Sequence, residues 1–294
     1  MQTIPAKTII GRVKKPAEWF GAEYNMNIYR GCTHGCIYCD SRSECYRDPD
    51  FDKLKVKEDA LRIIRDELRR KIKTGVIGTG AMSDPYNPLE KELNMTRNAL
   101  ELINAFNFGI AIVTKSDLVT RDIDILQDIK THSPAIVKIS ITTANDELCK
   151  KLEPNVSNSL ERFAALEELA KKDIYCGVLM MPILPFINDT EENILGILTK
   201  AKNAGARFVY PAMGLTLRTG NREYYYEKLD QLFPGLKLKY AKRYGDRYQC
   251  SSPNAKRLWN VFQESCHKLG LIYDMKAITS QYRMGYGEKQ LKLF

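Results

Sequence analysis

The feature that most constrains the fold of this chain is an alternation of short apolar segments with amphipathic ones. From about Asn25 onward, a strand pattern followed by a helix pattern occurs six times, and the strand patterns are mostly apolar, as in parallel sheets. The predicted strands are 25–30, 75–79, 109–114, 135–142, 174–181 and 207–210. The predicted helices between them are 57–73, 96–106, 121–131, 158–172 and 191–204. Repeated units of this kind require right-handed crossovers and a parallel sheet.

Two α/β architectures satisfy that requirement, and the positions of polar residues distinguish them. The glycine-, hydroxyl- and sulfur-containing segments described below nearly all come directly after a strand, on five or six different strands. An open doubly wound sheet gathers such residues at one switch point, whereas a barrel spreads them around its mouth. We therefore predict an α/β fold with a partial (β/α)6 TIM-like barrel over 1–215. Residues 216–294 would form a basic, Tyr-rich, mainly helical C-terminal extension that packs on the barrel.

A loop with three cysteines follows the first predicted strand. Cys32, Cys36 and Cys39 have C-x3-C-x2-C spacing, which allows three thiolates to converge. Cysteine thiolates are the usual ligands of iron–sulfur clusters, and a closed site uses four of them. Three ligands would therefore hold a [4Fe-4S] cluster and leave one iron open to another molecule.

A zinc knuckle is the alternative for this loop, with Cys45 or His34 as the fourth ligand. Zinc sites usually combine two similar halves separated by a longer loop, and no second half follows here. The remaining cysteines are scattered, unlike those of a secreted disulfide scaffold. Because no apolar stretch has the character of a signal peptide or a membrane span, we expect a cytoplasmic protein with reduced thiols and no membrane association.

The wider string NIYRGCTHGCIYC, with Tyr38 before the last cysteine, resembles the signature of the radical S-adenosylmethionine (SAM) superfamily. The later segments SDPYNPLE at 83–90 and LEPN at 152–155 look like the branch related to spore photoproduct lyase. The similarity covers roughly residues 20–215, which is the whole predicted barrel.

The resemblance implies an enzyme whose [4Fe-4S] cluster binds SAM through its open iron and cleaves it reductively. The resulting 5'-deoxyadenosyl radical would abstract a hydrogen atom from a substrate in a lyase-like reaction, while the protein orients the cofactor and excludes water. The implied partners are SAM and an electron donor such as flavodoxin or ferredoxin.

The resemblance also implies contacts to SAM at the mouth of the barrel. The segment Gly78-Thr79-Gly80 follows the second strand, where small residues let the backbone meet the methionine amino group. Lys115 would pair with the methionine carboxylate, and Ser140 with that group or the ribose, with Thr142 on the same strand. The alternatives are a plain strand-to-loop bend, a solvated loop lysine and satisfied core hydroxyls.

Three further groups would complete the cofactor site. Tyr38 would lie along the adenine, or pack beneath the loop. Ser83 and Asp84 open a rigid turn, and Asp84 would face the site unless it only caps the loop. The methionines and prolines over 180–185 and 211–213 would form an apolar wall beside the adenine, or simply fill the core.

One position departs from the pattern of spore photoproduct lyases. In those enzymes a cysteine just before the Ser-Asp pair returns a hydrogen atom to the product radical, whereas this chain has Ala81 and Met82 there. Cys45 is the nearest other thiol, and no known pattern gives it that role. The photoproduct reaction is therefore in doubt for this chain.

The segment 218–257 holds ten Lys and Arg against four acidic residues, so six of the nine excess positive charges lie there. Tyr240, Tyr244 and Tyr248 are spaced by four and would share one face of a helix. Interleaved basic and aromatic residues suit single-stranded or flipped bases, through phosphate pairing and stacking. We favour the alternative, a helical layer that closes the open side of the barrel, with the tyrosines inward and the lysines in water.

Two classes of function are compatible with these features. The first is a radical SAM enzyme acting on a nucleic-acid lesion, as in DNA repair of the photolyase-like kind, or else on a peptide or small molecule. The second is a non-catalytic iron–sulfur or zinc protein that uses the loop structurally. Cofactor-like residues on several strand ends favour the enzyme. The sequence identifies no residue for the substrate chemistry itself.

Overall fold

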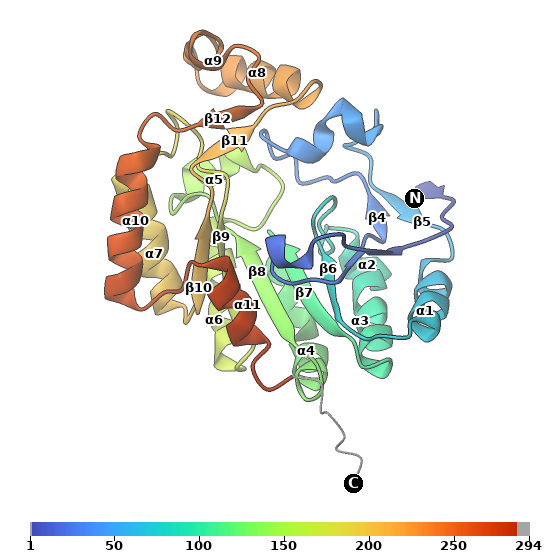
Figure 1. Cartoon of the computed structure of the whole chain (residues 1–294). Coiled ribbons are helices and arrows are strands. Elements are labelled where there is room, and N and C mark those ends of the chain that lie inside the picture. The colour runs from blue at the N-terminus through green and yellow to red at the C-terminus, as the bar shows by residue number, and fades with distance from the viewer. Residues whose placement is uncertain (1, 287–294) are drawn as a thin grey trace.

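A computed structural model describes residues 2–286, and its main element is a seven-stranded sheet (Figure 1). The strand order is β10-β9-β8-β7-β6-β3-β2, in which β3 to β10 run parallel and β2 is antiparallel to β3. These strands are β2 Ile10–Arg12, β3 Tyr24–Met26, β6 Val76–Thr79, β7 Gly109–Thr114, β8 Ala135–Ser140, β9 Tyr175–Met180 and β10 Phe208–Pro211.

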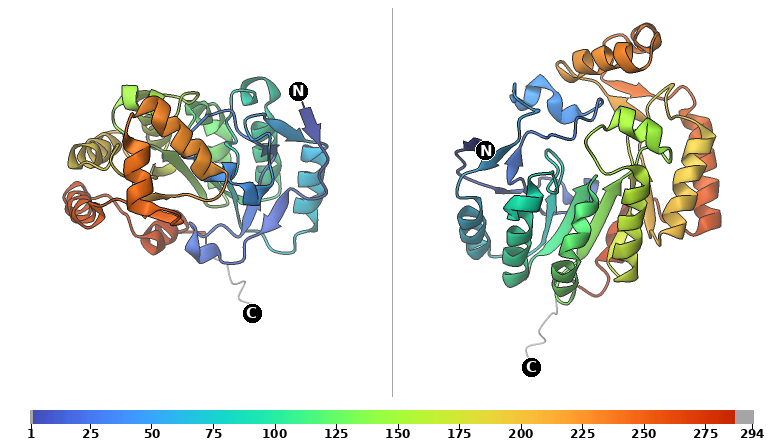
Figure 2. Two further views of the ribbon diagram at one scale, coloured as in Figure 1. Left: turned by 90° about the horizontal axis from the view of Figure 1, so that it is seen from above. Right: turned by 180° about the vertical axis from the view of Figure 1, so that it is seen from behind.

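Helices in the crossovers cover the outer side of the sheet (Figure 2). They are α1 Ala60–Arg70, α3 Met95–Ala105, α4 Ile123–Lys130, α6 Ser159–Lys171 and α7 Glu191–Asn203, and the short helices α2 Glu90–Leu93 and α5 Asp146–Leu152 lie in loops. Their apolar faces and the outward residues of the strands form the largest core, which includes Ile103, Val137 and Ile197. The predicted partial (β/α)6 barrel is confirmed.

The first predicted strand differs from the structure. Segment 25–30 is divided between β3 and a second strand, β4 Tyr29–Arg30, which belongs to a separate three-stranded sheet with β1 Gln2–Ile4 and β5 Lys55–Lys57. β1 and β5 are distant in sequence from each other, so local periodicity does not reveal this sheet. The cysteine loop therefore starts from β4, beside the barrel rather than on it.

The inner side of the barrel is filled at the amino ends of the strands. Phe20, Ile136 and Phe208 belong to a second core, against which α11 Met275–Tyr282 packs. The Tyr282 hydroxyl donates to the carbonyl oxygen of Phe20 at 2.6 Å, which joins α11 to the segment before β3. The carboxyl ends of the strands are left for a cavity.

The C-terminal part is mainly helical, as predicted. β11 Gly214–Thr216 pairs with β12 Gln249–Ser251, while α8 Asn221–Leu232 and α9 Leu236–Tyr244 lie above the carboxyl ends of the strands (Figure 1). α10 Ala255–Leu269 packs along α7. The predicted boundary at 215 falls within β11, and the division into two parts stays a prediction.

The tyrosines of the basic segment are mostly turned inward. Tyr240 and Tyr244 are buried, and the Tyr240 hydroxyl donates to the carbonyl oxygen of Pro185 at 2.8 Å. The prediction was wrong for Tyr248, which is 44% exposed, because α9 ends before Gly245, whose φ is +51°. The helical pair also lies over the mouth of the barrel rather than along its open side.

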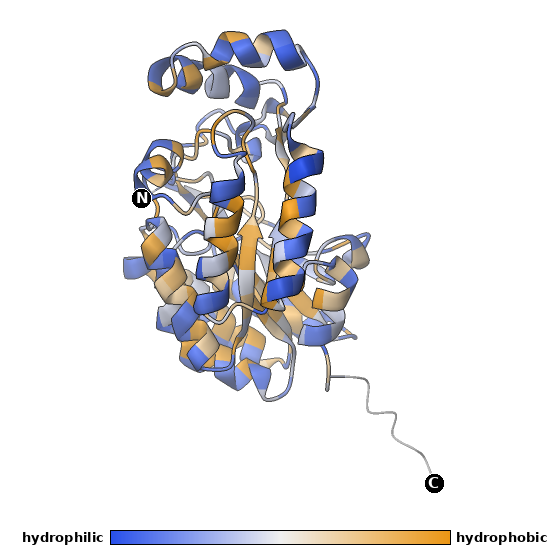
Figure 3. Cartoon of the chain, turned by 90° about the vertical axis from the view of Figure 1, so that its left-hand side faces the viewer, coloured by the Kyte–Doolittle hydropathy of each residue, from blue (hydrophilic) through white to orange (hydrophobic). Residues whose placement is uncertain are grey.

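Figure 3 shows hydrophilic residues on the faces of the helices turned toward the viewer, with apolar strand residues between them. Hydrophobic side chains thus gather between the helices and the sheet. Within residues 2–286, no helix has the length and apolar character that a membrane span requires.

Candidate functional site: a cavity at the mouth of the barrel

A cavity of about 850 Å³ lies at the carboxyl ends of the strands, and we call it the mouth cavity. Its walls come from the cysteine loop, from the ends of β6 to β10, and from β11, β12 and the first turns of α10. The predicted site residues that line it are Tyr38, Cys39, Gly80, Lys115 and Ser140. The fold thus brings residues from four separate segments to one wall.

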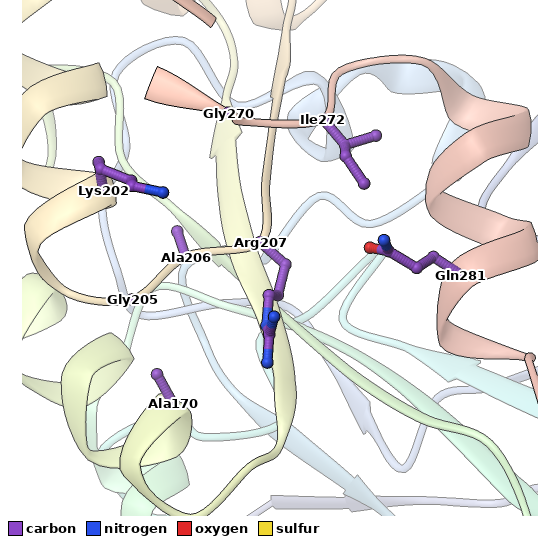
Figure 4. A pocket seen from close by; sticks show the side chains of 8 residues that line it. All are labelled: Ala170, Lys202, Gly205, Ala206, Arg207, Gly270, Ile272 and Gln281. Atoms are coloured by element: carbon purple, nitrogen blue, oxygen red, sulfur yellow. The ribbon is translucent and has the colours of Figure 1, made fainter. Parts of the chain in front are cut away.

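A second pocket, of about 400 Å³, lies at the opposite ends of the strands (Figure 4). Arg207, just before β10, and Gln281 of α11 are among the residues that line it. None of the predicted site residues is among them. In a parallel barrel the functional side is the carboxyl side, which also favours the mouth cavity.

The cysteine loop is shaped by close backbone packing. Gly31 has φ +79°, and a Cβ there would lie 2.5 Å from the carbonyl oxygen of Lys53, so a side chain does not fit. The Cys36 side chain is buried, whereas Cys32 and Cys39 are partly exposed. Burial raises the pKa of Cys32 to about 11, so a metal cluster that binds this thiol must displace its proton.

The three thiols lie near one another, yet they do not form a site for a single ion. Burial is the largest cause of the raised pKa of Cys36, and the nearby Cys39 and Cys32 raise that pKa further. No group of three or more His, Cys, Asp or Glu side chains within residues 2–286 could hold one metal ion. Three cysteines in one loop are the ligand set that the cluster prediction requires, and their role as ligands stays a prediction.

The two alternative zinc ligands are engaged elsewhere. His34 is buried, with its Nδ1 atom 3.5 Å from Asp84 Oδ2. Cys45 is exposed, and its sulfur lies 3.7 Å from Arg218 Nη1. Neither residue is arranged as a fourth ligand with the three thiols.

The LEPN segment at 152–155 clamps the cysteine loop through its backbone. The amide of Ile37 donates to the carbonyl oxygen of Leu152 at 3.0 Å, and the amide of Asn155 donates to that of His34 at 3.1 Å. Asn155 Nδ2 also donates to the carbonyl oxygen of Thr33 at 2.9 Å. These bonds fix the loop between its first and second cysteines and just after the second.

A buried charge pair connects the same clamp to α6. Glu153 accepts a hydrogen bond from the Tyr38 hydroxyl and pairs with the guanidinium of Arg162. Arg162 also donates to the carbonyl oxygen of Ser140 at 2.7 Å. Burial would raise the pKa of Glu153, but the charges of Arg162 and Lys115 outweigh it and lower the pKa. An ionised Glu153 therefore holds Tyr38 directly, and it holds Arg162, which in turn bonds the end of β8.

Lys115 places a positive charge on the cavity wall beside the cysteine loop. Its Nζ atom lies 5.9 Å from the centroid of the Tyr38 ring. Lost hydration lowers the pKa of Lys115, but the Cys36 sulfur and the Glu153 carboxylate outweigh this and raise it. A lasting ammonium charge here suits the predicted pairing with a carboxylate.

Ser83 and Asp84 fasten the loops around the mouth. Asp84 Oδ1 accepts from Thr114 Oγ1 at 2.7 Å, and Oδ2 accepts from the backbone amide of Lys115 at 2.7 Å. Ser83 Oγ donates to the carbonyl oxygen of Gly31 at 2.6 Å. Neither residue lines the mouth cavity. This is the arrangement expected if Asp84 caps the loop, and contact of either residue with SAM stays a prediction.

The two glycines at the end of β6 differ in whether a side chain would fit. Gly80 has φ +95°, and a Cβ there would lie 1.9 Å from the carbonyl oxygen of Val113 on β7. At Gly78 the nearest atom to such a Cβ would be 3.3 Å away. The close approach of β7 therefore requires glycine at Gly80, whereas Gly78 and Thr79 do not line the cavity and their contact with SAM stays a prediction.

The end of β8 and the far wall complete the cavity. Ser140 lines it, whereas Thr142 is buried outside the lining, with a hydroxyl that has no hydrogen-bond partner among the described residues. Met181, Pro182, Pro211, Ala212 and Met213 line the cavity as an apolar wall, and their contact with the adenine stays a prediction. Met180 instead lies in the core.

The chain matches the sequence pattern of the Radical SAM superfamily over residues 26–198. That match covers the cysteine loop and the strands up to β9. The chain belongs to the radical SAM superfamily. As a radical SAM protein it uses a [4Fe-4S] cluster and SAM.

Relatives and solved structures resemble the chain to different extents. An uncharacterized protein of Methanocaldococcus jannaschii is 34% identical over 190 residues, which are 64% of this chain and 69% of that protein. A radical SAM Nalpha-GlyT isomerase of Pseudomonas phage M6 is 23% identical over 158 residues, or 53% of this chain and 32% of the isomerase. A spore photoproduct lyase variant with bound AdoMet and dinucleoside spore photoproduct has a TM-score of 0.60 and 17% identity, covering 86% of this chain and 77% of that one.

Several residues of this radical SAM site were missed by the sequence reasoning. Glu153 lies within the LEPN segment, but its partner Arg162 is on another helix, and no local pattern pairs them. The two tryptophans, Trp19 and Trp259, line the mouth cavity from segments at opposite ends of the chain. Outside the site, Lys138 carried a usable signal, because it is a lone charge within the apolar strand β8, but it does not line the cavity.

Proposed function

We propose that this chain is a radical SAM enzyme that abstracts a hydrogen atom from a base of a nucleic acid. The observation that carries the proposal is the mouth cavity, where the cysteine loop and the ends of several strands share one wall. A structural iron–sulfur protein has no need of an open cavity beside its cluster.

The proposed roles of the residues follow from their positions. Cys32, Cys36 and Cys39 would hold the cluster. When bound, the cluster and SAM supply the one-electron cleavage of SAM and the group that removes a hydrogen atom from the substrate. Lys115 would neutralise the carboxylate of SAM, and Tyr38, fixed by Glu153, would support its adenine.

The remaining predicted SAM contacts belong to the same proposal. Gly80 and Ser140 would present backbone and hydroxyl groups to the cofactor from the cavity wall. Gly78, Thr79, Ser83, Asp84 and Thr142 lie outside that lining and would support the wall from behind. Electrons would come from a donor such as flavodoxin or ferredoxin in the cytoplasm, where thiols stay reduced.

Two kinds of support favour a nucleic-acid substrate. Spore photoproduct lyase, which shares the fold, binds a dinucleoside photoproduct, and the phage relative is named as an isomerase of Nalpha-GlyT. The chain also has a formal net charge of +9, with most of the excess in 218–257, above the mouth. A peptide or small-molecule substrate is the alternative.

The position before the Ser-Asp pair limits the kind of reaction. Ala81 lines the mouth cavity, and Cys39 is the only cysteine that does so within residues 2–286. With Cys39 assigned to the cluster, no thiol of the described chain borders the space where a substrate would lie. We therefore propose that no cavity thiol returns a hydrogen atom, and that the radical left on the substrate is quenched by one electron from the same donor and one proton from solvent.

The test compares the wild-type chain with Cys36→Ala and with Cys45→Ala as the matched control. Each protein is reconstituted anaerobically with iron and sulfide, reduced with dithionite in the presence of SAM and an oligonucleotide, and analysed for bound iron and for 5'-deoxyadenosine. We expect cluster and 5'-deoxyadenosine in the wild type and in Cys45→Ala, because that thiol is exposed and outside the loop. Cys36→Ala should lose both.

Two outcomes would contradict the proposal. Zinc binding without cluster formation in the wild type would overturn the cofactor assignment. A fully loaded wild type that yields no 5'-deoxyadenosine with oligonucleotide, but does with a peptide, would overturn the nucleic-acid assignment.

A further inference from the structure

Both tryptophans of the chain line the mouth cavity. The sequence contains two, Trp19 and Trp259, and each keeps 38% of its surface exposed. A tryptophan is usually well buried in a folded domain, because its large apolar surface favours burial. Two half-exposed tryptophans on one cavity therefore mark a surface suited to an apolar, planar ligand.

The two rings are held in place by aromatic neighbours. Trp19 packs edge-on against Phe20, with ring centroids 5.0 Å apart and an interplanar angle of 86°. Trp259 stacks on Phe262 at 5.5 Å and 26°, and meets Tyr273 edge-on at 6.1 Å. Because these contacts restrict the rings before any ligand arrives, binding a ligand costs them little conformational entropy.

The polar groups beside Trp259 add a positive charge. Lys256 lines the cavity one helical turn before Trp259, and Gln249 faces it from β12. Neither side chain has a hydrogen bond or an ion pair in the described part of the chain. Asp40, a carboxylate on the same wall, lies 3.4 Å from Arg218 Nε and is thereby compensated. This part of the cavity therefore favours an anion next to a flat ring.

The cavity has room for this ligand together with SAM. The proposed SAM contacts Tyr38, Gly80 and Lys115 come from the cysteine loop, β6 and β7, whereas the tryptophans and Lys256 come from the segment before β3 and from α10. A volume of about 850 Å³ lies at the upper end of the range of small-molecule sites. Two groups can thus occupy it side by side.

We propose that Trp19, Trp259 and Lys256 form a nucleotide subsite, in which an unstacked base lies against the tryptophans and its phosphate pairs with Lys256. The subsite deepens the proposed function and rests on it. Base stacking on aromatic side chains tolerates different bases, and a neighbouring lysine supplies phosphate affinity. An aromatic peptide side chain would use the tryptophans but leave Lys256 without an anion.

The test uses tryptophan fluorescence, which in this chain comes from the cavity alone. Trp19→Phe and Trp259→Phe each leave one tryptophan, so each variant reports on one wall. Reconstituted, unreduced protein is titrated with a short single-stranded oligothymidylate. We expect quenching in both variants with the same midpoint, and a roughly ten-fold weaker affinity in Trp19→Ala and in Trp259→Ala.

Lysine variants test the phosphate contact. Lys256→Gln should weaken oligothymidylate binding at low salt, whereas Lys202→Gln, in the pocket at the opposite end of the barrel, should leave it unchanged. Melting temperatures of all variants close to that of the wild type would show that the fold is kept.

The outcomes separate the subsite from the proposed function. Unchanged fluorescence, unchanged affinity of both alanine variants, or quenching by a tyrosine-containing peptide but not by oligothymidylate would overturn the subsite. If the wild type still forms 5'-deoxyadenosine with oligonucleotide in those cases, the proposed function stands. Quenching and weakened binding as expected, without any 5'-deoxyadenosine from loaded protein, would support the subsite and overturn the proposed function.

Discussion

Lys138 is a charged residue in the interior of the barrel. It lies on the inner side of β8, between Val113 of β7 and Gly177 of β9, and only 1% of its surface is exposed. Its ammonium lies 4.6 Å from the centroid of the Phe20 ring, and no ion pair or hydrogen bond to it is present within residues 2–286. Burial lowers the pKa of Lys138 to about 7.

This lysine predicts a pH-dependent stability. A lysine whose pKa is lower in the folded than in the unfolded chain binds fewer protons when folded, so the folded state gains stability as pH rises from about 7 toward 10.5. Replacing Lys138 with methionine removes this effect. We expect Lys138→Met to be more stable than the wild type at pH 7, with a difference that shrinks by up to about 1.4 kcal/mol per pH unit above it.

Urea unfolding at several pH values between 7 and about 9 measures the difference. Lys172→Met is the matched control, because Lys172 is exposed, and its stability should follow the wild type at every pH. Parallel pH curves for the wild type and Lys138→Met would show that the buried amine does not titrate in this range.

Among the residues around the mouth, those in a local motif could be singled out from the sequence, and those in long-range pairs could not. The spacing of Cys32, Cys36 and Cys39 within one loop predicts converging thiolates, and their role as cluster ligands stays a prediction. Glu153 and Arg162 acquire their roles only when α5 and α6 come together, as Trp19 and Trp259 do when the barrel closes. Asp84 was predicted to face the site at the mouth. Its carboxylate instead accepts hydrogen bonds from the Thr114 hydroxyl and from the backbone amide of Lys115.

At the scale of elements, the connection between α5 and α6 supports the cysteine loop. Glu153→Gln would keep the size of the side chain but remove the charge that Arg162 faces in a buried site. Breaking one partner of a buried ion pair costs about 3–5 kcal/mol, so we expect a loss of that order in the free energy of unfolding. Less iron should also be retained after reconstitution, because Tyr38 loses its charged acceptor. Urea unfolding and iron analysis measure the two effects.

Glu147→Gln is the matched control for this prediction. Glu147 lies on α5 with a side chain that is 82% exposed, and its partner Lys150 is 3.5 Å away at the surface. Such surface pairs contribute little, so stability and iron content should stay close to those of the wild type. Equal effects of the two substitutions would mean that the buried pair does not hold the loop.

The order of strands and helices was predictable because hydrophobic residues recur with a different period in a strand than in a helix. The sequence predicts β7 with the observed bounds and the other barrel strands to within a few residues. It fails for β4, which takes its partner β5 from beyond the cysteine loop, and for the end of α9, where Gly245 stops a helix that the tyrosine spacing would continue. In both cases the deciding factor is a pairing or backbone conformation that hydrophobic spacing does not encode.

For the whole molecule, charge is distributed unevenly, and most of the excess positive charge lies in the segment above the mouth cavity. The segment 218–257 contributes six of the nine excess positive charges. Within it, α9 has four basic residues and no acidic one and lies over the carboxyl ends of the strands, whereas α8 has two basic and three acidic residues. Some of these side chains are paired, such as Lys237 with Asp230 and Arg257 with Glu191. The exposed Lys242 and Arg243 on α9 are in no such pair within the described residues. The field at the mouth should therefore attract a polyanion toward the cavity.

This distribution predicts how salt affects binding of a single-stranded oligonucleotide. Each phosphate neutralised by a basic side chain releases counterions, so the logarithm of the binding constant falls with the logarithm of salt concentration, by about 0.7 per contact. We expect the double variant Lys242→Gln, Arg243→Gln to bind more weakly at low salt and to show a shallower slope.

The matched control is the double variant Lys171→Gln, Lys172→Gln. It removes the same charge at the far end of α6 and should keep the wild-type slope. Fluorescence titrations at several salt concentrations measure both, and equal slopes for the two double variants would show that the charge above the mouth does not contact the oligonucleotide.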